Sequence, residues 1–218
     1  MLVRLGLARP RTFFQLRSIV STHGLTRKCP KCSSPLSTPL PACANCWSIS
    51  AVPNDTPYHD IFSLPSGGNA FKIDTSLLKQ RFREAQSVCH PDTWASKGEN
   101  EEEAAQILSS LVNHAYQTLS NPLSRLDYIL KTNGLPFAED DRVEDTDFLA
   151  NVLMMHEDLQ EAESQQEVER IESEIEEQMS EGIDEVERLI GEQKWEQAKE
   201  LGLKLRSLEG VRRASRNK

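Results

Sequence analysis

The sequence predicts an all-α protein, in which a helical hairpin is followed by a C-terminal three-helix bundle, with a small four-cysteine metal-binding module near the N-terminus. Three observations support this prediction. Apolar residues recur at helical spacing over several long segments, a capping residue precedes two of the expected helices, and two Cys-x-x-Cys pairs lie close together. The chain has 218 residues, of which 38% are hydrophobic, and this is enough to bury the cores of two small domains.

Residues 1–24 have the composition of a targeting segment. Between Met1 and Lys28 there are six cations and no acid, and the apolar residues form no continuous run. This pattern predicts a mitochondrial transit peptide and a matrix location, with a disordered basic tail as the alternative. Nucleic-acid binding is not expected, because the net charge of -9 would repel phosphates. No run of 18 apolar residues occurs, so no membrane span is expected either.

Residues 25–52 are expected to form a zinc-binding module. Two Cys-x-x-Cys pairs can supply four thiolates to one tetrahedral metal ion, and the prolines around them favour loops over helices. The predicted ligands are Cys29, Cys32, Cys43 and Cys46. Iron in a rubredoxin-like site and paired disulfides remain alternatives. An apolar core is scarcely available here, so the metal is expected to hold the module together. Residues 52–57 are expected to form a linker. Cys89, the fifth cysteine, is expected to be a buried thiol.

The hairpin is predicted from two amphipathic stretches, residues 77–89 and 100–119. The first places its apolar residues on one helical face and its cations off that face. The apolar positions are Leu78, Phe82, Ala85 and Cys89, and the cations are Lys79, Arg81 and Arg83. The second stretch repeats apolar residues at Ala104, Leu108, Leu111, Ala115 and Leu119. Between the two stretches, Pro91 should end the first helix, so that His90 and Asp92 project from an exposed loop.

Shorter elements flank the hairpin. Residues 58–64 are expected to form a short helix whose Ile61 and Phe62 point inward. Asp74 is a candidate N-cap for the basic helix, and Asn121 for a further helix that begins at Pro122. That helix should end at Asn133-Gly134, and the acidic, aperiodic residues 134–146 should form the domain junction.

Beyond the junction, three apolar stripes predict the helices of a bundle. The stripes are Leu149, Val152, Leu153, His156 and Leu159, then Val168, Ile171, Ile175, Met179, Ile183, Val186 and Ile190, then Trp195, Ala198, Leu201, Leu205 and Leu208. From Glu139 to Glu192 there are 21 acids and three bases, which is typical of a solvated face. Coiled-coil dimerisation of the middle helix is the alternative, and weak self-association stays open.

The sequence gives no grouping of nucleophile, base and orienting residue, so catalysis is not expected. An acid-base pair formed by His90 and Asp92 would lie at an exposed tip, without the dry pocket that proton transfer needs. Loops of this kind are more often contact surfaces. The triplet and its cationic helix therefore indicate recognition of an acidic partner.

Several segments between residues 57 and 133 resemble the J domain of the DnaJ class. The segments are Tyr58-His59-Asp60-Ile61-Phe62, Phe71-Lys72-Ile73-Asp74, His90-Pro91-Asp92 and Asn113-His114-Ala115-Tyr116-Gln117-Thr118-Leu119. Residues 122–130 and the acidic C-terminal part resemble the HscB (Jac-type) branch, the iron-sulfur cluster co-chaperones, and the cysteine pairs resemble the N-terminal module of its animal members.

The resemblance implies a J-type co-chaperone with two partners. It implies that a mitochondrial DnaK-class heat-shock ATPase binds His90, Pro91 and Asp92 together with Lys79, Arg81 and Arg83. It also implies that residues 140–212 form a three-helix domain that binds an IscU-type scaffold protein through Leu149, Leu153, Glu157 and Glu161. The sequence departs from the family pattern at Ala150, Met154 and Ser207, which predicts a weaker or shifted scaffold site. The alternatives are a redox or metal-sensing protein that uses the cysteine pairs, and a general J protein with another client.

Overall fold

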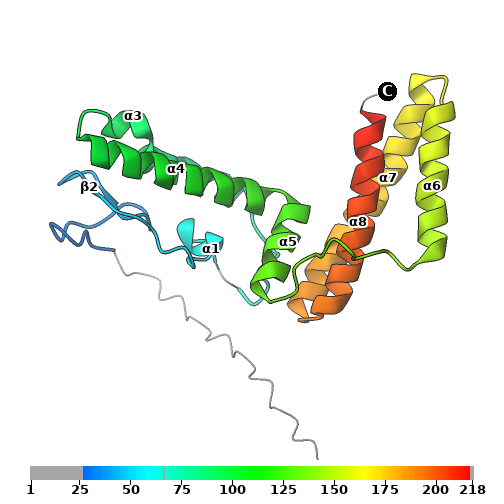
Figure 1. Cartoon of the computed structure of the whole chain (residues 1–218), viewed down its shortest axis with the longest axis horizontal. Coiled ribbons are helices and arrows are strands. Elements are labelled where there is room, and N and C mark those ends of the chain that lie inside the picture. The colour runs from blue at the N-terminus through cyan, green and yellow to red at the C-terminus, as the bar shows by residue number, and fades with distance from the viewer. Residues whose placement is uncertain (1–26, 66, 217–218) are drawn as a thin grey trace, which may run out of the picture.

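The computed structural model describes residues 27–65 and 67–216 and shows two arms joined by one short helix (Figure 1). The elements are β1 (Ala42–Cys43), β2 (Ser48–Ile49), α1 (Tyr58–Ile61), α2 (Thr75–Cys89), α3 (Pro91–Trp94), α4 (Glu99–Ser120), α5 (Pro122–Thr132), α6 (Thr146–Glu161), α7 (Gln165–Gly191) and α8 (Trp195–Ser215). The first arm holds the β-hairpin and α1 to α4, the second holds α6 to α8, and α5 lies at the joint. The predicted all-α fold is confirmed, and the expected transit peptide lies outside the described residues.

Helices α2 and α4 form the predicted hairpin. Asp74 begins α2 as expected, because its carboxylate accepts hydrogen bonds from the backbone N–H groups of Ser76 and Leu77. The first apolar face is confirmed at Leu78, Ala85 and Cys89, all fully buried. The apolar face predicted for the second helix was misplaced in part. Leu108, Ala115 and Leu119 are buried in α4 as predicted, and the buried residues that the prediction missed are Ala105, Ser109 and Val112. A buried face several residues wide includes neighbours that one stripe leaves out.

The cysteine module packs on the hairpin. The two strands pair antiparallel, with Ala42 opposite Ile49. Leu40 and Ala42 are buried in the same apolar cluster as Leu78, and Val52 of the expected linker packs against that cluster. The expectation that metal alone holds the module was therefore incomplete, since part of its core is supplied by the neighbouring helices.

Helix α5 joins the two arms because its apolar face is buried with the bundle. Asn121 caps it as predicted, accepting from the N–H of Ser124, and the helix ends before Gly134, whose φ of 79° suits glycine. Its buried apolar residues are Leu126, Ile129 and Leu130. Arg125 is also buried and donates to the carbonyl oxygens of Leu119 and Phe71, both at 2.7 Å, so its charge is hydrogen-bonded inside the joint.

The second arm is the predicted three-helix bundle. Helix α7 begins with a capping box between Ser164 and Glu167, which satisfies backbone donors that the first helical turn leaves free. Ile175 and Leu205 lie at the centre of the core that α7 and α8 share. Within residues 27–65 and 67–216, no helix is long and apolar enough to cross a bilayer.

Candidate functional site

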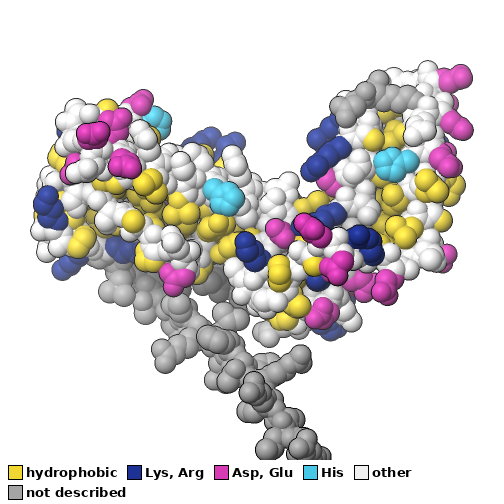
Figure 2. Space-filling view, in the orientation of Figure 1, with side chains coloured by type: hydrophobic (Ala, Val, Ile, Leu, Met, Phe, Trp, Pro, Cys, Tyr) yellow, Lys and Arg dark blue, Asp and Glu magenta, His cyan; other side chains and the backbone are white. Residues whose placement is uncertain are grey.

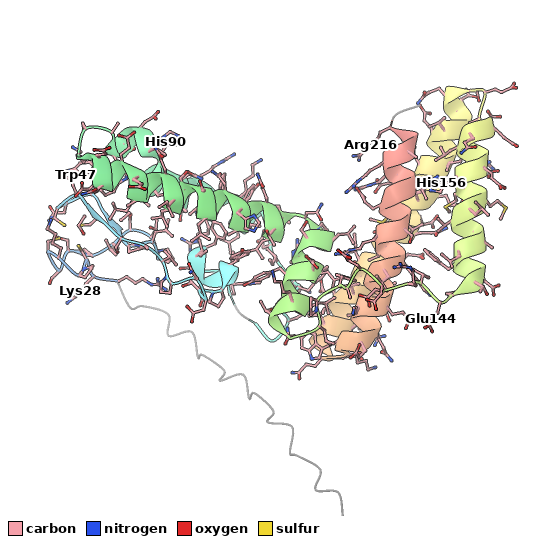
Figure 3. All side chains as sticks on the ribbon, in the orientation of Figure 1. Lys28, Trp47, His90, Glu144, His156 and Arg216 are labelled. Atoms are coloured by element: carbon pink, nitrogen blue, oxygen red, sulfur yellow. The ribbon has the colours of Figure 1, made fainter. Side chains whose placement is uncertain are left out.

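The His90-Pro91-Asp92 triplet lies at the far end of the first arm, where α2 stops and α3 starts (Figure 3). His90 has an extended backbone, with φ −63° and ψ 129°, because the proline ring that follows disfavours the helical region. Its N–H donates to the carbonyl of Gln86 at 2.9 Å and closes α2. Pro91 occupies the first turn of α3, where a missing N–H costs little. The bend is a helix end followed by one helical turn, rather than an open loop.

Both polar side chains of the triplet are exposed. His90 is 54% exposed and Asp92 is 91% exposed, and Nδ1 of His90 lies 3.7 Å from the carboxylate of Asp92. The same Nδ1 accepts the backbone N–H of Asp92 at 3.3 Å, which fixes the orientation of the ring. The arrangement presents an imidazole edge and a carboxylate to a partner, and it offers no enclosed pocket for chemistry.

The cations on α2 differ in their surroundings. Lys79 and Arg83 are exposed, whereas Arg81 forms an ion pair with Glu84 at 2.9 Å. Arg81 also lines a cleft of about 200 Å³ between α2 and the cysteine module, together with Thr38. Lys79 and Arg83 therefore contribute more unpaired charge to the surface than Arg81 does.

The two Cys-x-x-Cys segments fold into turns of the same kind. In each turn the fourth residue after the first cysteine donates its N–H to the carbonyl of that cysteine, from Ser33 to Cys29 at 2.8 Å and from Trp47 to Cys43 at 3.0 Å. Both donors have a positive φ, 61° at Ser33 and 53° at Trp47. The two turns thus present their cysteine pairs toward each other in matching conformations.

The four sulfur atoms fit one tetrahedral metal ion. They lie within 4.8 Å of one another, and two pairs, Cys29 with Cys46 and Cys32 with Cys43, are 3.6 Å apart. Four thiolates at the usual zinc distance of about 2.3 Å would be separated by about 3.8 Å, so little rearrangement is needed. All four cysteines are free thiols here. Hydrogen bonds from Ser34 lower the pKa of Cys32 to about 5, whereas burial raises the pKa of Cys46 to about 11. A metal ion bound by the four sulfur atoms would favour the thiolate form of both.

The outer face of α6 carries apolar and acidic side chains (Figure 2). Leu149, Leu153 and Met154 are 42%, 59% and 55% exposed, and Glu157 and Glu161 are exposed beside them. The expectation that Leu149 and Leu153 share one stripe with the packing residues of α6 is wrong. The buried residues of the helix are Met155 and Leu159. Met154, which the sequence analysis named as a departure from the family pattern at the scaffold site, is part of this exposed patch.

The comparisons with known proteins agree with this geometry. A family model described as the HSCB C-terminal oligomerisation domain matches residues 144–214. The human iron-sulfur cluster co-chaperone protein HscB is 34% identical over 170 residues, covering 78% of this chain and 71% of the relative. The co-chaperone protein HscB of Proteus mirabilis (strain HI4320) is 35% identical over 154 residues, covering 68% and 89%. The crystal structure of human co-chaperone protein HscB superimposes with a TM-score of 0.75 at 28% identity, covering 88% of this chain and 98% of that one.

Fold, site and relatives together define a co-chaperone of iron-sulfur cluster assembly, a class of protein that is not enzymatic. The chain belongs to the HscB family, as the resemblance predicted, and it carries an N-terminal four-cysteine cluster that could bind a metal ion.

Proposed function

We propose that this protein stimulates the ATPase of a mitochondrial Hsp70-class (DnaK-class) chaperone and delivers an IscU-type iron-sulfur scaffold to it. The observation that carries the proposal is the separation of two exposed surfaces. The His90-Pro91-Asp92 triplet ends the first arm, and the apolar face of α6 lies on the second arm (Figure 1). Two partners could therefore be bound at once without competing for one surface.

The triplet and the α2 cations suit the chaperone. Lys79 and Arg83, with Arg81 beside them, would steer an acidic surface toward α2, and this attraction should weaken as ionic strength rises. Once docked, His90 and Asp92 would add directional hydrogen bonds. Hydrolysis would take place in the chaperone, whose equilibrium between states this contact would bias.

The α6 face suits the scaffold. Leu149 and Leu153 are separated by one helical turn and lie next to Glu157 and Glu161, so an apolar contact is bordered by carboxylates. Met154, which stands where the family often has an acidic residue, adds apolar area to the patch. A surface of this kind suits an interface of modest affinity, from which a client can be passed on.

The remaining assignments follow from the same set of features. Zinc is the proposed occupant of the four-cysteine cluster, with a structural role, because four thiolates in a closed site are typical of structural zinc. Residues 25–52, 57–133 and 140–212 are the proposed metal module, J domain and scaffold-binding domain. The proposed matrix location depends on the composition of residues 1–24.

The test is an ATPase assay with the purified chaperone, the scaffold and the full chain. His90→Gln should reduce the stimulation to the basal rate without changing helical content. His114→Gln is the matched control, because His114 is another exposed histidine of the same hairpin, and it should retain stimulation. A redox function predicts the converse, with stimulation lost in Cys29→Ser plus Cys43→Ser and retained in His90→Gln.

A further inference from the structure

Trp47 comes directly after the last cysteine of the metal module, and its backbone conformation is set by that module. Its φ of 53° lies in the left-handed region, which non-glycine residues rarely adopt. The hydrogen bond from its N–H to Cys43 closes the turn between Cys43 and Cys46. Since both of these cysteines belong to the four-sulfur cluster, a metal bound there would hold the turn in place.

The side chain of Trp47 reaches out of the module to the segment that follows the His90-Pro91-Asp92 triplet. Its ring meets Trp94 edge-on, with the centroids 5.6 Å apart and an interplanar angle of 79°. Nζ of Lys97 lies 3.6 Å from the centroid of the Trp47 ring. Figure 3 shows Trp47 and His90 at the same end of the first arm. The module is thus in contact with the last residue of α3 and with Lys97 of the short connection between α3 and α4.

Trp94 links this contact to the triplet. The indole is 1% exposed, and its Nε1 donates to the carbonyl of Val88 at 3.0 Å. Val88 lies in the last turn of α2, where carbonyl groups lack a partner within the helix. The hydrogen bond therefore closes a loop that contains all three residues of the triplet. Helix α3 has four residues and is too short to be stable without such support.

We propose that Trp47 is a positioning residue for the chaperone-stimulating triplet, so that the metal module braces the J domain as well as binding metal. The proposal rests on the function proposed above. Without the Trp47 ring, Trp94 and Lys97 lose a packing partner, and α3 would open more often. His90 and Asp92 would then have to be ordered on binding, which weakens affinity without changing what the docked complex does.

The test compares Trp47→Ala with Trp47→Phe, which keeps an aromatic ring, in titrations of the full chain against the chaperone ATPase. Trp47→Ala should raise the half-maximal concentration about 3- to 10-fold, the range that an aromatic pair contributes, and leave the maximal stimulation unchanged. Trp47→Phe should stay near wild type. Amide exchange at Thr93 and Ala95, whose N–H groups bond to His90 and Pro91, should quicken in Trp47→Ala. Scaffold binding should not change, since α6 lies on the other arm.

Lys97→Gln provides a variant that leaves the module untouched. Lys97→Gln should raise the half-maximal concentration about 2-fold, in line with the loss of one exposed cation–π contact. This variant replaces Trp47→Ala as the test of the proposal if Trp47→Ala loses its metal. If Trp47→Ala keeps its metal and has the half-maximal concentration of wild type, Trp47 is not a positioning residue. If Trp47→Ala loses its metal, an unchanged half-maximal concentration in Lys97→Gln would refute the proposal in the same way. The proposed function would still stand as long as His90→Gln abolishes stimulation. If His90→Gln has no effect, the proposed function fails first.

Discussion

Leu149→Ala combined with Leu153→Ala should weaken scaffold binding and leave the fold intact. Full burial of a leucine side chain contributes about 1.5–3 kcal/mol, and these side chains, at 42% and 59% exposure, still have roughly half of their surface to bury. Each should then contribute about 1 kcal/mol to the interface, and the pair about 2 kcal/mol, which corresponds to a dissociation constant about 30-fold higher. Stability should change by less than about 0.5 kcal/mol, because neither residue belongs to the core.

The assay is isothermal titration calorimetry of the full chain with a purified IscU-type scaffold, accompanied by urea unfolding. Ile107→Ala is the matched control, since Ile107 is 61% exposed on α4 of the other arm and should not affect the affinity. A double variant that binds within 2-fold of wild type would refute the assignment of this face. An equal loss in Ile107→Ala would show that the effect is not local to α6.

Three further predictions concern the packing and ionisation of the two arms. A Cβ at Gly202 would lie 2.7 Å from Leu126 and 2.8 Å from Phe137, so Gly202→Ala should destabilise the protein by about 1–3 kcal/mol in urea unfolding. Gly210 is the control on the same helix, because a Cβ there would meet no atom within 4 Å. Gly210→Ala should leave the stability unchanged or raise it by up to about 1 kcal/mol. The hydrogen bond from Lys204 holds the pKa of Asp145 below its ordinary value of 3.8. The contribution of this ion pair to the free energy of unfolding should be complete above pH 3.8 and should be lost as the pH falls further. The melting temperatures of wild type and Asp145→Asn, measured from about pH 2 to about pH 6, should therefore become equal at the acidic end. Burial raises the pKa of Cys89 to about 11, so iodoacetamide should label Cys89 at pH 8 (about half a unit below an ordinary thiol pKa) only after unfolding in denaturant.

Local features of the sequence accounted for several helix boundaries. Asp74, Asn121 and Gly134 mark the ends of helices because capping depends on the side chain or backbone freedom of one residue. The bend at Pro91 was predicted for the same reason, since a proline restricts its own backbone and that of the residue before it. The cysteine spacing likewise predicted the cluster of four sulfur atoms.

The sequence did not predict correctly which face of α6 is buried. In α6 the apolar residues outnumber the positions that the bundle can bury, so a period of 3.6 residues fits more than one face. The sequence could not decide that Met155 is buried while Leu153 and Met154 are exposed, because that choice depends on where α7 and α8 lie. The exposed face of α6 is therefore a product of packing.

By itself, the sequence determined the helical class, the caps at Asp74 and Asn121, the exposed triplet and the cluster of four cysteines, since each depends on neighbours along the chain or on a fixed spacing. The tertiary structure decided that Leu40 and Ala42 pack on the hairpin, that α5 shares its core with the bundle, and that Trp47 meets Trp94. These contacts join residues far apart in the chain. No local pattern encodes such contacts, because the free energy of burying apolar surface depends on area and not on sequence separation.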